Sequence, residues 1–120
     1  MAKIMIVEDL AITQEILKEV LGLDGHTVIF SAYNGQEAID YFLNNENEMP
    51  DLVLMDHRMP GKDGITTMKE IFEITDTIVV IFVSADPTAQ NAALEMGAVD
   101  YLIKPISVKS FLEKVNKFTL

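Results

Sequence analysis

The chain has 120 residues, of which 49% are hydrophobic and 23% charged, as is typical of one soluble globular domain. Nineteen acidic and nine basic residues give a net charge of −10, which disfavours direct nucleic-acid binding because such binding requires a basic surface. The chain contains no cysteine, which excludes disulfides, thiolate metal sites and cysteine nucleophiles.

The apolar segments are too short to enter a membrane. The longest strictly apolar run, residues 78–83, is far shorter than the ~20 residues that a spanning helix needs. The N-terminal segment meets an acid at Glu8, so it lacks the apolar core of a signal peptide. We therefore expect a cytoplasmic protein without membrane insertion, with a single domain over residues 1–120 and no output domain in the chain.

Apolar runs alternate with amphipathic stretches along the chain. Strands are predicted at residues 3–8, 26–32, 51–56, 77–84 and 99–104. Helices are predicted from Leu10 to Leu23, from Asn34 to Leu43, from Asp63 to about Ile74, between Asp86 and Gly97, and from Ser107 to Phe118. The first of these helices repeats its apolar residues at Ile12, Ile16, Leu17, Val20 and Leu21.

Capping residues mark the ends of these helices. Asn34, with Glu37 three residues later, resembles a capping box. Asp86 precedes a proline at the first helical position, which is a typical helix start. Gly25 and Gly97 follow the first and fourth predicted helices, where glycine commonly ends a helix.

Five strands that alternate with five helices predict an α/β fold with a doubly wound parallel sheet, (βα)₅. The predicted strands at 3–8, 51–56 and 77–84 are apolar almost throughout, as interior parallel strands are. Those at 26–32 and 99–104 are more mixed, as edge strands are. We therefore expect the flavodoxin-like strand order 2-1-3-4-5, with its topological switch point between the first and third strands.

Polar side chains end four of the five predicted strands. The first strand ends in Glu8 and Asp9, the third in Asp56, the fourth in Ser84 and the fifth in Lys104. Ligands of such sheets bind outside these carboxyl ends, at the switch point. Asp56 would therefore not be buried alone, since it would share a cleft with two acids, a hydroxyl and an ammonium group.

Three carboxylates at close range need a cation, since repulsion otherwise drives a proton onto one of them. One lysine compensates only partly, and Mg²⁺ suits a set of oxygen ligands. A carboxylate nucleophile, a metal that neutralises charge and a lysine that binds an oxyanion together form a phosphoryl-transfer site. Capping acids and edge-strand polarity explain any one of these residues, but they do not explain the whole set.

The motifs at these positions resemble the receiver domains of two-component response regulators, including the stand-alone chemotaxis type, over residues 3–118. IVED at 6–9 resembles the acidic pair of that family, and LVLMD at 52–56 with MPGKDG at 59–64 resembles its phosphoacceptor strand and loop. VSA at 83–85 and GAVDYLIKP at 97–105 resemble the fourth strand and the end of the domain. The fold implied is the receiver form of the (βα)₅ sheet predicted above.

The resemblance also implies roles for individual residues. Asp56 would accept the phosphoryl group, and Lys104 would pair with that group or with Asp56. The Mg²⁺ ligands would be Glu8, through water, Asp9, Asp56 and the backbone carbonyl of Arg58. The Ser84 hydroxyl would move to bond a phosphoryl oxygen, and Tyr101 would rotate inward as an aromatic switch. The peptide bond between Lys104 and Pro105 would be cis.

The partners implied are a sensor histidine kinase, whose phosphohistidine donates the phosphoryl group, and a downstream target or phosphotransfer protein. The output face would comprise the fourth helix, the fifth strand and the fifth helix, and a dimer formed on phosphorylation is a further expectation. The chain would be a signalling switch that catalyses only its own phosphorylation and dephosphorylation.

Two charged residues beside the site form a separate hypothesis. Arg58 lies two residues after Asp56, and Asp86 lies two residues after Ser84. We expect an ion pair between them across the mouth of the cleft, which would partly shield the acyl phosphate and tune its lifetime. The alternative is that Asp86 serves only as a helix cap.

Other functions account for the sequence less well. A haloacid-dehalogenase-type phosphatase needs a second aspartate where this chain has Arg58, which cannot act as a proton donor. A flavodoxin-like cofactor carrier is disfavoured because Glu8 and Asp9 would repel phosphate. An inert receiver-like scaffold is disfavoured by the intact site. His26 and His57 are expected to be ordinary strand and loop residues. The C-terminal lysines either complement the last helix or meet an acidic partner.

Overall fold

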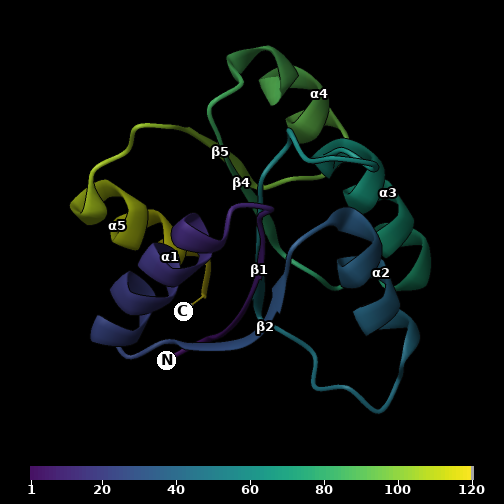
Figure 1. Cartoon of the computed structure of the whole chain (residues 1–120), viewed down its shortest axis with the longest axis horizontal. Coiled ribbons are helices and arrows are strands. Elements are labelled where there is room, and N and C mark those ends of the chain that lie inside the picture. The colour runs from purple at the N-terminus through teal and green to yellow at the C-terminus, as the bar shows by residue number, and fades with distance from the viewer. Residues whose placement is uncertain (120) are drawn as a thin grey trace.

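A five-stranded parallel sheet forms the centre of the computed structural model, which describes residues 1–119 (Figure 1). The strands are β1 Lys3–Val7, β2 Thr27–Ala32, β3 Leu52–Met55, β4 Val80–Ser84 and β5 Asp100–Ile103. The helices are α1 Ala11–Leu23, α2 Gly35–Leu43, α3 Gly64–Ile74, α4 Gln90–Glu95 and α5 Val108–Thr119. The sheet order is β2-β1-β3-β4-β5, which confirms the predicted α/β fold and its topology.

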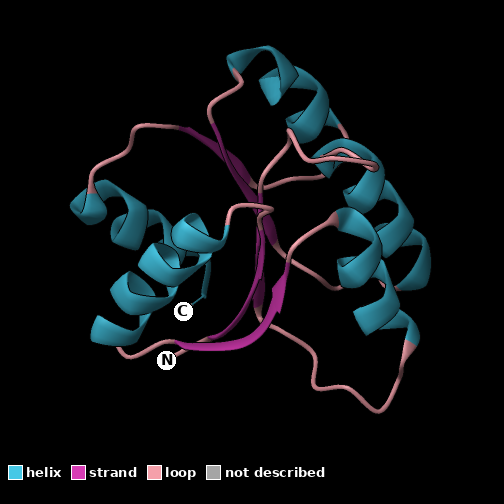
Figure 2. Ribbon diagram, viewed as in Figure 1, coloured by secondary structure: helices cyan, strands magenta, loops and turns pink. Residues whose placement is uncertain are grey.

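Helices cover both faces of the sheet, α1 and α5 on one face and α2, α3 and α4 on the other (Figure 2). Side chains alternate along each strand, so Ile4 and Ile6 of β1 pack under α1 and α5, while Met5 and Val7 face the other layer. This burial on both faces explains why the central strands are continuous apolar runs. Among residues 1–119, no helix has the length and hydrophobicity that crossing a bilayer requires.

Apart from the fourth, the predicted strands each differ from the structure by one residue at one or both ends, and three larger differences occur. The fourth strand begins at Val80 rather than at residue 77. The fourth helix is divided into a 3₁₀ turn at Pro87–Ala89 and a short α4, because Asp86 caps the backbone N–H only two residues ahead. In α1 the predicted apolar face is confirmed at Leu17, Val20 and Leu21, which pack in the core. It is wrong at Ile12 and Ile16, which are exposed, whereas Gln14 is fully buried.

The predicted helix caps are confirmed at Asn34, Asp63 and Gly25. Asn34 Oδ1 accepts a hydrogen bond from Glu37 N at 2.8 Å, and Glu37 Oε1 accepts one from Tyr33 N rather than from Asn34 N. Asp63 Oδ1 accepts a hydrogen bond from Thr66 N at 2.8 Å at the start of α3. Gly25 follows α1 with a φ of 85°, a left-handed conformation that glycine adopts without strain.

A buried histidine ties the chain termini to the sheet. His26 Nδ1 accepts a hydrogen bond from Ala2 N at 3.0 Å, so its other nitrogen carries the proton and donates to Asn116 Oδ1 at 2.8 Å. Asn116 Nδ2 in turn donates to Asp24 Oδ2. His26 therefore links the N-terminus, the end of α1 and α5, and it lies at the amino end of β2, away from the carboxyl edge of the sheet.

Helices α2 and α3 approach each other closely at Gly35. A Cβ atom on Gly35 would overlap Thr67 Oγ1 and lie 3.1 Å from Lys62 Cβ. Thr67 is fully buried, and its hydroxyl donates to the carbonyl of Asp63 at 2.8 Å, so it has little freedom to move aside. The absence of a side chain at Gly35 is therefore a packing requirement.

We expect Gly35→Ala to lower the free energy of unfolding by about 2 kcal/mol, because the added methyl group overpacks the α2–α3 contact. Gly22→Ala on α1 is the matched control, since a Cβ there meets nothing within 4 Å and alanine has the higher helix propensity. Urea unfolding of both variants measures the difference. A Gly35→Ala protein as stable as the Gly22→Ala protein would contradict this account of the contact.

Candidate functional site

Acidic residues from two neighbouring strands meet at the carboxyl edge of the sheet. Val7 of β1 lies opposite Met55 of β3 in the parallel register, so the residues that follow them leave the sheet side by side. The carboxylate oxygens of Glu8, Asp9 and Asp56 lie within 4.8 Å of one another. Sequence reasoning predicted this cluster, and the structure brings it together.

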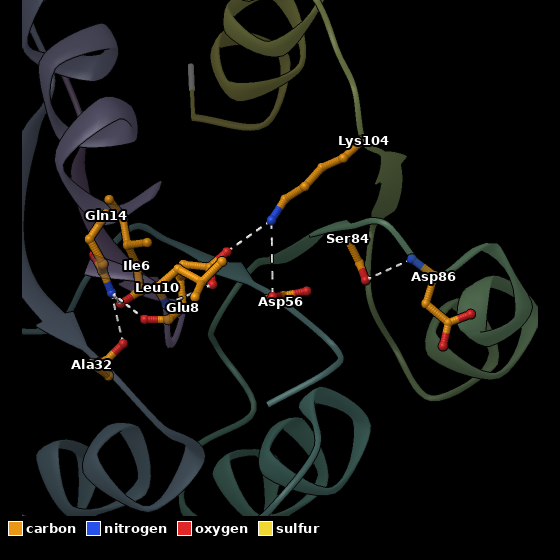
Figure 3. Close-up of polar contacts among 9 residues, drawn as sticks. All are labelled: Ile6, Glu8, Leu10, Gln14, Ala32, Asp56, Ser84, Asp86 and Lys104. Carbon is orange, nitrogen blue, oxygen red and sulfur yellow. Dashed lines mark hydrogen bonds and ion pairs between the residues drawn. The ribbon is translucent and has the colours of Figure 1, made fainter. Parts of the chain in front are cut away.

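Lys104 approaches the cluster from the end of β5 (Figure 3). Its Nζ lies 2.9 Å from Glu8 Oε1 and 4.0 Å from Asp56 Oδ2, so its hydrogen-bond partner is Glu8. The expected pairing with Asp56 is a longer-range attraction in this structure. The peptide bond between Lys104 and Pro105 is cis, as the resemblance implied.

The acidic cluster fits a hard divalent cation. Burial raises the pKa of the Asp9 carboxyl above its ordinary value, and the hydrogen bond and negative charge of Glu8 raise it further. All the donors are carboxylate oxygens, the ligands that Mg²⁺ prefers. Asp9, Asp56 and Arg58 line the same open cleft of about 570 Å³, so a cation with its waters can enter.

Ser84 lines the same cleft, and Tyr101 of β5 contacts the segment that follows Ser84. Ser84 is buried, and its Oγ accepts a hydrogen bond from Asp86 N at 3.2 Å. The Tyr101 ring is only 4% exposed and stacks on Phe82, with 5.4 Å between the ring centroids. Its hydroxyl donates to the backbone carbonyl of Asp86, and burial raises its pKa. The inward position expected for Tyr101 is therefore the position that it has here.

The ion pair expected across the cleft mouth is present. Arg58 Nε lies 3.0 Å from Asp86 Oδ2, with the arginine side chain 79% exposed. The other oxygen, Asp86 Oδ1, accepts from Thr88 N at 2.9 Å and from Thr88 Oγ1 at 2.6 Å. These hydrogen bonds from Thr88 and Arg58 lower the pKa of Asp86 to about 2. Asp86 is thus both a helix cap and the partner of Arg58.

Gly64, the first residue of α3, lets this helix begin directly against the acceptor strand. A Cβ atom there would overlap the backbone carbonyl of Asp56 and lie 2.7 Å from the Phe82 ring. Gly64 N also donates to the carbonyl of His57 at 2.8 Å. The His57 ring lies near Phe82, with 6.3 Å between the two ring centroids. Its Nδ1 is buried and has no hydrogen-bond partner among residues 1–119.

Sequence reasoning missed two residues that shape the site. Gly64 closes the MPGKDG segment, so the signal for it was the motif itself, although its contact with the Asp56 carbonyl appears only in the structure. Gln14 is fully buried beside Glu8, and no sequence signal marked it, because the helical period placed apolar residues at the expected inward positions.

Comparison with known proteins identifies the family. A family model described as the response regulator receiver domain matches residues 4–116. The chain is 36% identical over 117 residues to the chemotaxis protein CheY of Bacillus subtilis and covers 95% of that protein. It is 35% identical over 116 residues to the positive alginate biosynthesis regulatory protein of Pseudomonas aeruginosa, of which it spans 46%.

The fold also matches a solved structure that contains CheY. A chain of the CheX–CheY–BeF₃–Mg²⁺ complex from Borrelia burgdorferi matches with a TM-score of 0.87 and 29% identity. The match covers 98% of this chain and 89% of that one. Sequence motifs, strand order and the family model agree, and we conclude that the chain belongs to the response regulator receiver domain family.

Proposed function

We propose that this receiver accepts a phosphoryl group onto Asp56 from the phosphohistidine of a sensor histidine kinase, in a Mg²⁺-dependent reaction. The observation that carries the proposal is the meeting of three carboxylates and Lys104 at one open cleft. An Asp56 oxygen forms a bond to phosphorus as the phosphorus–nitrogen bond of the donor breaks. The protein supplies the nucleophile and the positive charge, and the donor supplies the phosphoryl group.

The residues around Asp56 would stabilise the phosphoryl group by binding Mg²⁺ or by donating hydrogen bonds. Glu8, Asp9, Asp56 and the backbone carbonyl of Arg58 would hold Mg²⁺, which neutralises charge on the phosphoryl oxygens. Lys104 starts on Glu8 and transfers one hydrogen bond to the phosphoryl group, a short movement because Asp56 lies only 4.0 Å away. The Ser84 hydroxyl accepts a hydrogen bond from Asp86 N, and its own proton would be donated to a phosphoryl oxygen.

The output is a protein contact on the face formed by α4, β5 and α5. Tyr101 connects this face to the cleft through the carbonyl of Asp86. Val99 and Ile103 on either side of it are about two-fifths exposed, so they offer apolar surface to a partner. We propose a regulator of chemotaxis or phosphorelay type whose partner there is a target protein, a phosphotransfer protein or a second copy of the chain.

The phosphoacceptor assignment predicts a metal-dependent adduct. The wild-type protein incubated with a small acyl-phosphate donor and Mg²⁺ should gain the mass of one phosphoryl group, and a chelator should abolish the gain. Asp56→Asn should show none, whereas Asp51→Asn, an exposed residue at the start of the same segment, should behave as wild type. Intact-mass spectrometry reads all four reactions. A phosphoryl adduct that persists on Asp56→Asn would mean that another residue is the phosphoacceptor.

The Arg58–Asp86 ion pair predicts an effect on phosphoryl lifetime. Arg58→Ala and Asp86→Ala should each speed dephosphorylation, by no more than about five-fold, because an exposed ion pair is a weak interaction. The double variant should be no faster than the faster single variant, since both remove one pair. Thr88→Val is the control, because it removes a hydroxyl bond to Asp86 and leaves Arg58 in place. Additive rates would mean that the two residues act independently.

A further inference from the structure

Gln14 of α1 presents its carboxamide to the carboxyl ends of β1 and β2 (Figure 3). Its side chain is fully buried, and Nε2 lies 3.2 Å from the carbonyl oxygen of Ile6, 3.1 Å from that of Glu8 and 2.8 Å from that of Ala32. The opposite orientation would face the amide oxygen against three carbonyl oxygens. The contacts therefore fix the nitrogen as the atom that points at the backbone.

These contacts complete a set of hydrogen bonds that holds Glu8 at every polar atom. The backbone N–H of Glu8 donates to the Ala32 carbonyl at 3.0 Å, and the backbone carbonyl of Glu8 accepts from Gln14. In the side chain, Oε1 accepts from Lys104 and Oε2 from Leu10 N at 3.1 Å. Gln14 thus fixes the peptide through which the chain passes from Glu8 to Asp9.

Core packing alone does not account for a glutamine at this position. The amide oxygen of Gln14 is buried and has no hydrogen-bond partner among residues 1–119, and leaving a buried acceptor unpaired is unfavourable. Leu21, on the same helix and equally buried, shows that this layer accepts an apolar side chain. An apolar residue of similar length would fill the space without the unpaired oxygen, but it would lack the two N–H donors that Gln14 shares among the three carbonyls.

We propose that Gln14 is a positioning residue for metal binding: its carboxamide sets the Glu8–Asp9 turn so that both carboxylates face Asp56. The inference rests on the proposed function, in which these acids hold Mg²⁺. Contacts that orient metal ligands from behind contribute strongly to affinity, and removing one commonly weakens metal binding ten- to a hundred-fold. Gln14 itself does not touch the metal or the phosphoryl group.

The test compares Gln14→Met with Leu21→Ala. Methionine keeps the length of the glutamine side chain and loses its donors, whereas Leu21→Ala weakens the same helix in the layer packed against α5. We expect Gln14→Met to bind Mg²⁺ about ten-fold more weakly than wild type in calorimetric titration. Leu21→Ala should retain wild-type affinity despite its lower stability in urea, because it leaves the Glu8–Asp9 turn untouched.

If a variant folds too poorly for calorimetric titration, its Mg²⁺ affinity can be measured from thermal unfolding instead. Mg²⁺ that binds only the folded state raises the unfolding temperature as its concentration rises, so the dissociation constant can be taken from thermal unfolding. Gln14→Asn, which keeps the amide but is one methylene shorter and cannot span the same distances, should show the same weakened response to Mg²⁺ as Gln14→Met.

The outcomes separate this inference from the function on which it rests. If the wild-type protein binds no Mg²⁺, the proposed metal site fails and the positioning role fails with it. If the wild type binds Mg²⁺ and Gln14→Met binds it equally well, the metal site stands and the positioning role is overturned. A parallel loss of affinity in Gln14→Met and Leu21→Ala would also overturn it, since general loosening of α1 would then explain both.

Discussion

The repulsion among three carboxylates governs the structure around the carboxyl edge of the sheet. Glu8, Asp9 and Asp56 place their oxygens within 4.8 Å of one another, an arrangement that burial makes more costly. Lys104 Nζ and the backbone N–H of Leu10 offset part of this cost by donating to the two oxygens of Glu8. Three carboxylates face one ammonium group here, and this excess of oxygen donors is what suits the site to a cation.

The sheet makes this arrangement possible by its register. Because β1 and β3 are neighbours in the strand order and Val7 lies opposite Met55, acids far apart in the sequence emerge together. Burial on both faces holds the strands rigidly, so the acids cannot relax apart by bending the sheet. Gly64 adds a second constraint, since α3 starts directly against the backbone carbonyl of Asp56 and limits its movement. The fold thus positions charges that would otherwise separate.

Strand order and the acidic edge were predictable because they depend on local patterns: apolar runs that end in polar residues, and caps such as Asn34 and Asp63. The inward face of α1 was predictable only in its second half, at Leu17, Val20 and Leu21. In the first half the hydrophobic period favours Ile12 and Ile16, yet the structure exposes both and buries Gln14, whose amide nitrogen hydrogen-bonds backbone carbonyls at the strand ends. Backbone acceptors of this kind leave no trace in side-chain hydropathy.

The sequence also could not predict which of the two neighbouring acids, Glu8 or Asp56, would bond Lys104. Lys104 has two acids within reach and bonds Glu8, whose position is fixed by its other hydrogen bonds, while Asp56 lines the open cleft. On the other side, Asp86 bonds Ser84 through its N–H and Tyr101 through its carbonyl. Tyr101 lies inward in this structure, with its ring buried against Phe82. The two contacts use the peptide units on either side of the Asp86 Cα atom, so the backbone of this one residue physically connects Ser84 of the cleft to Tyr101 of β5.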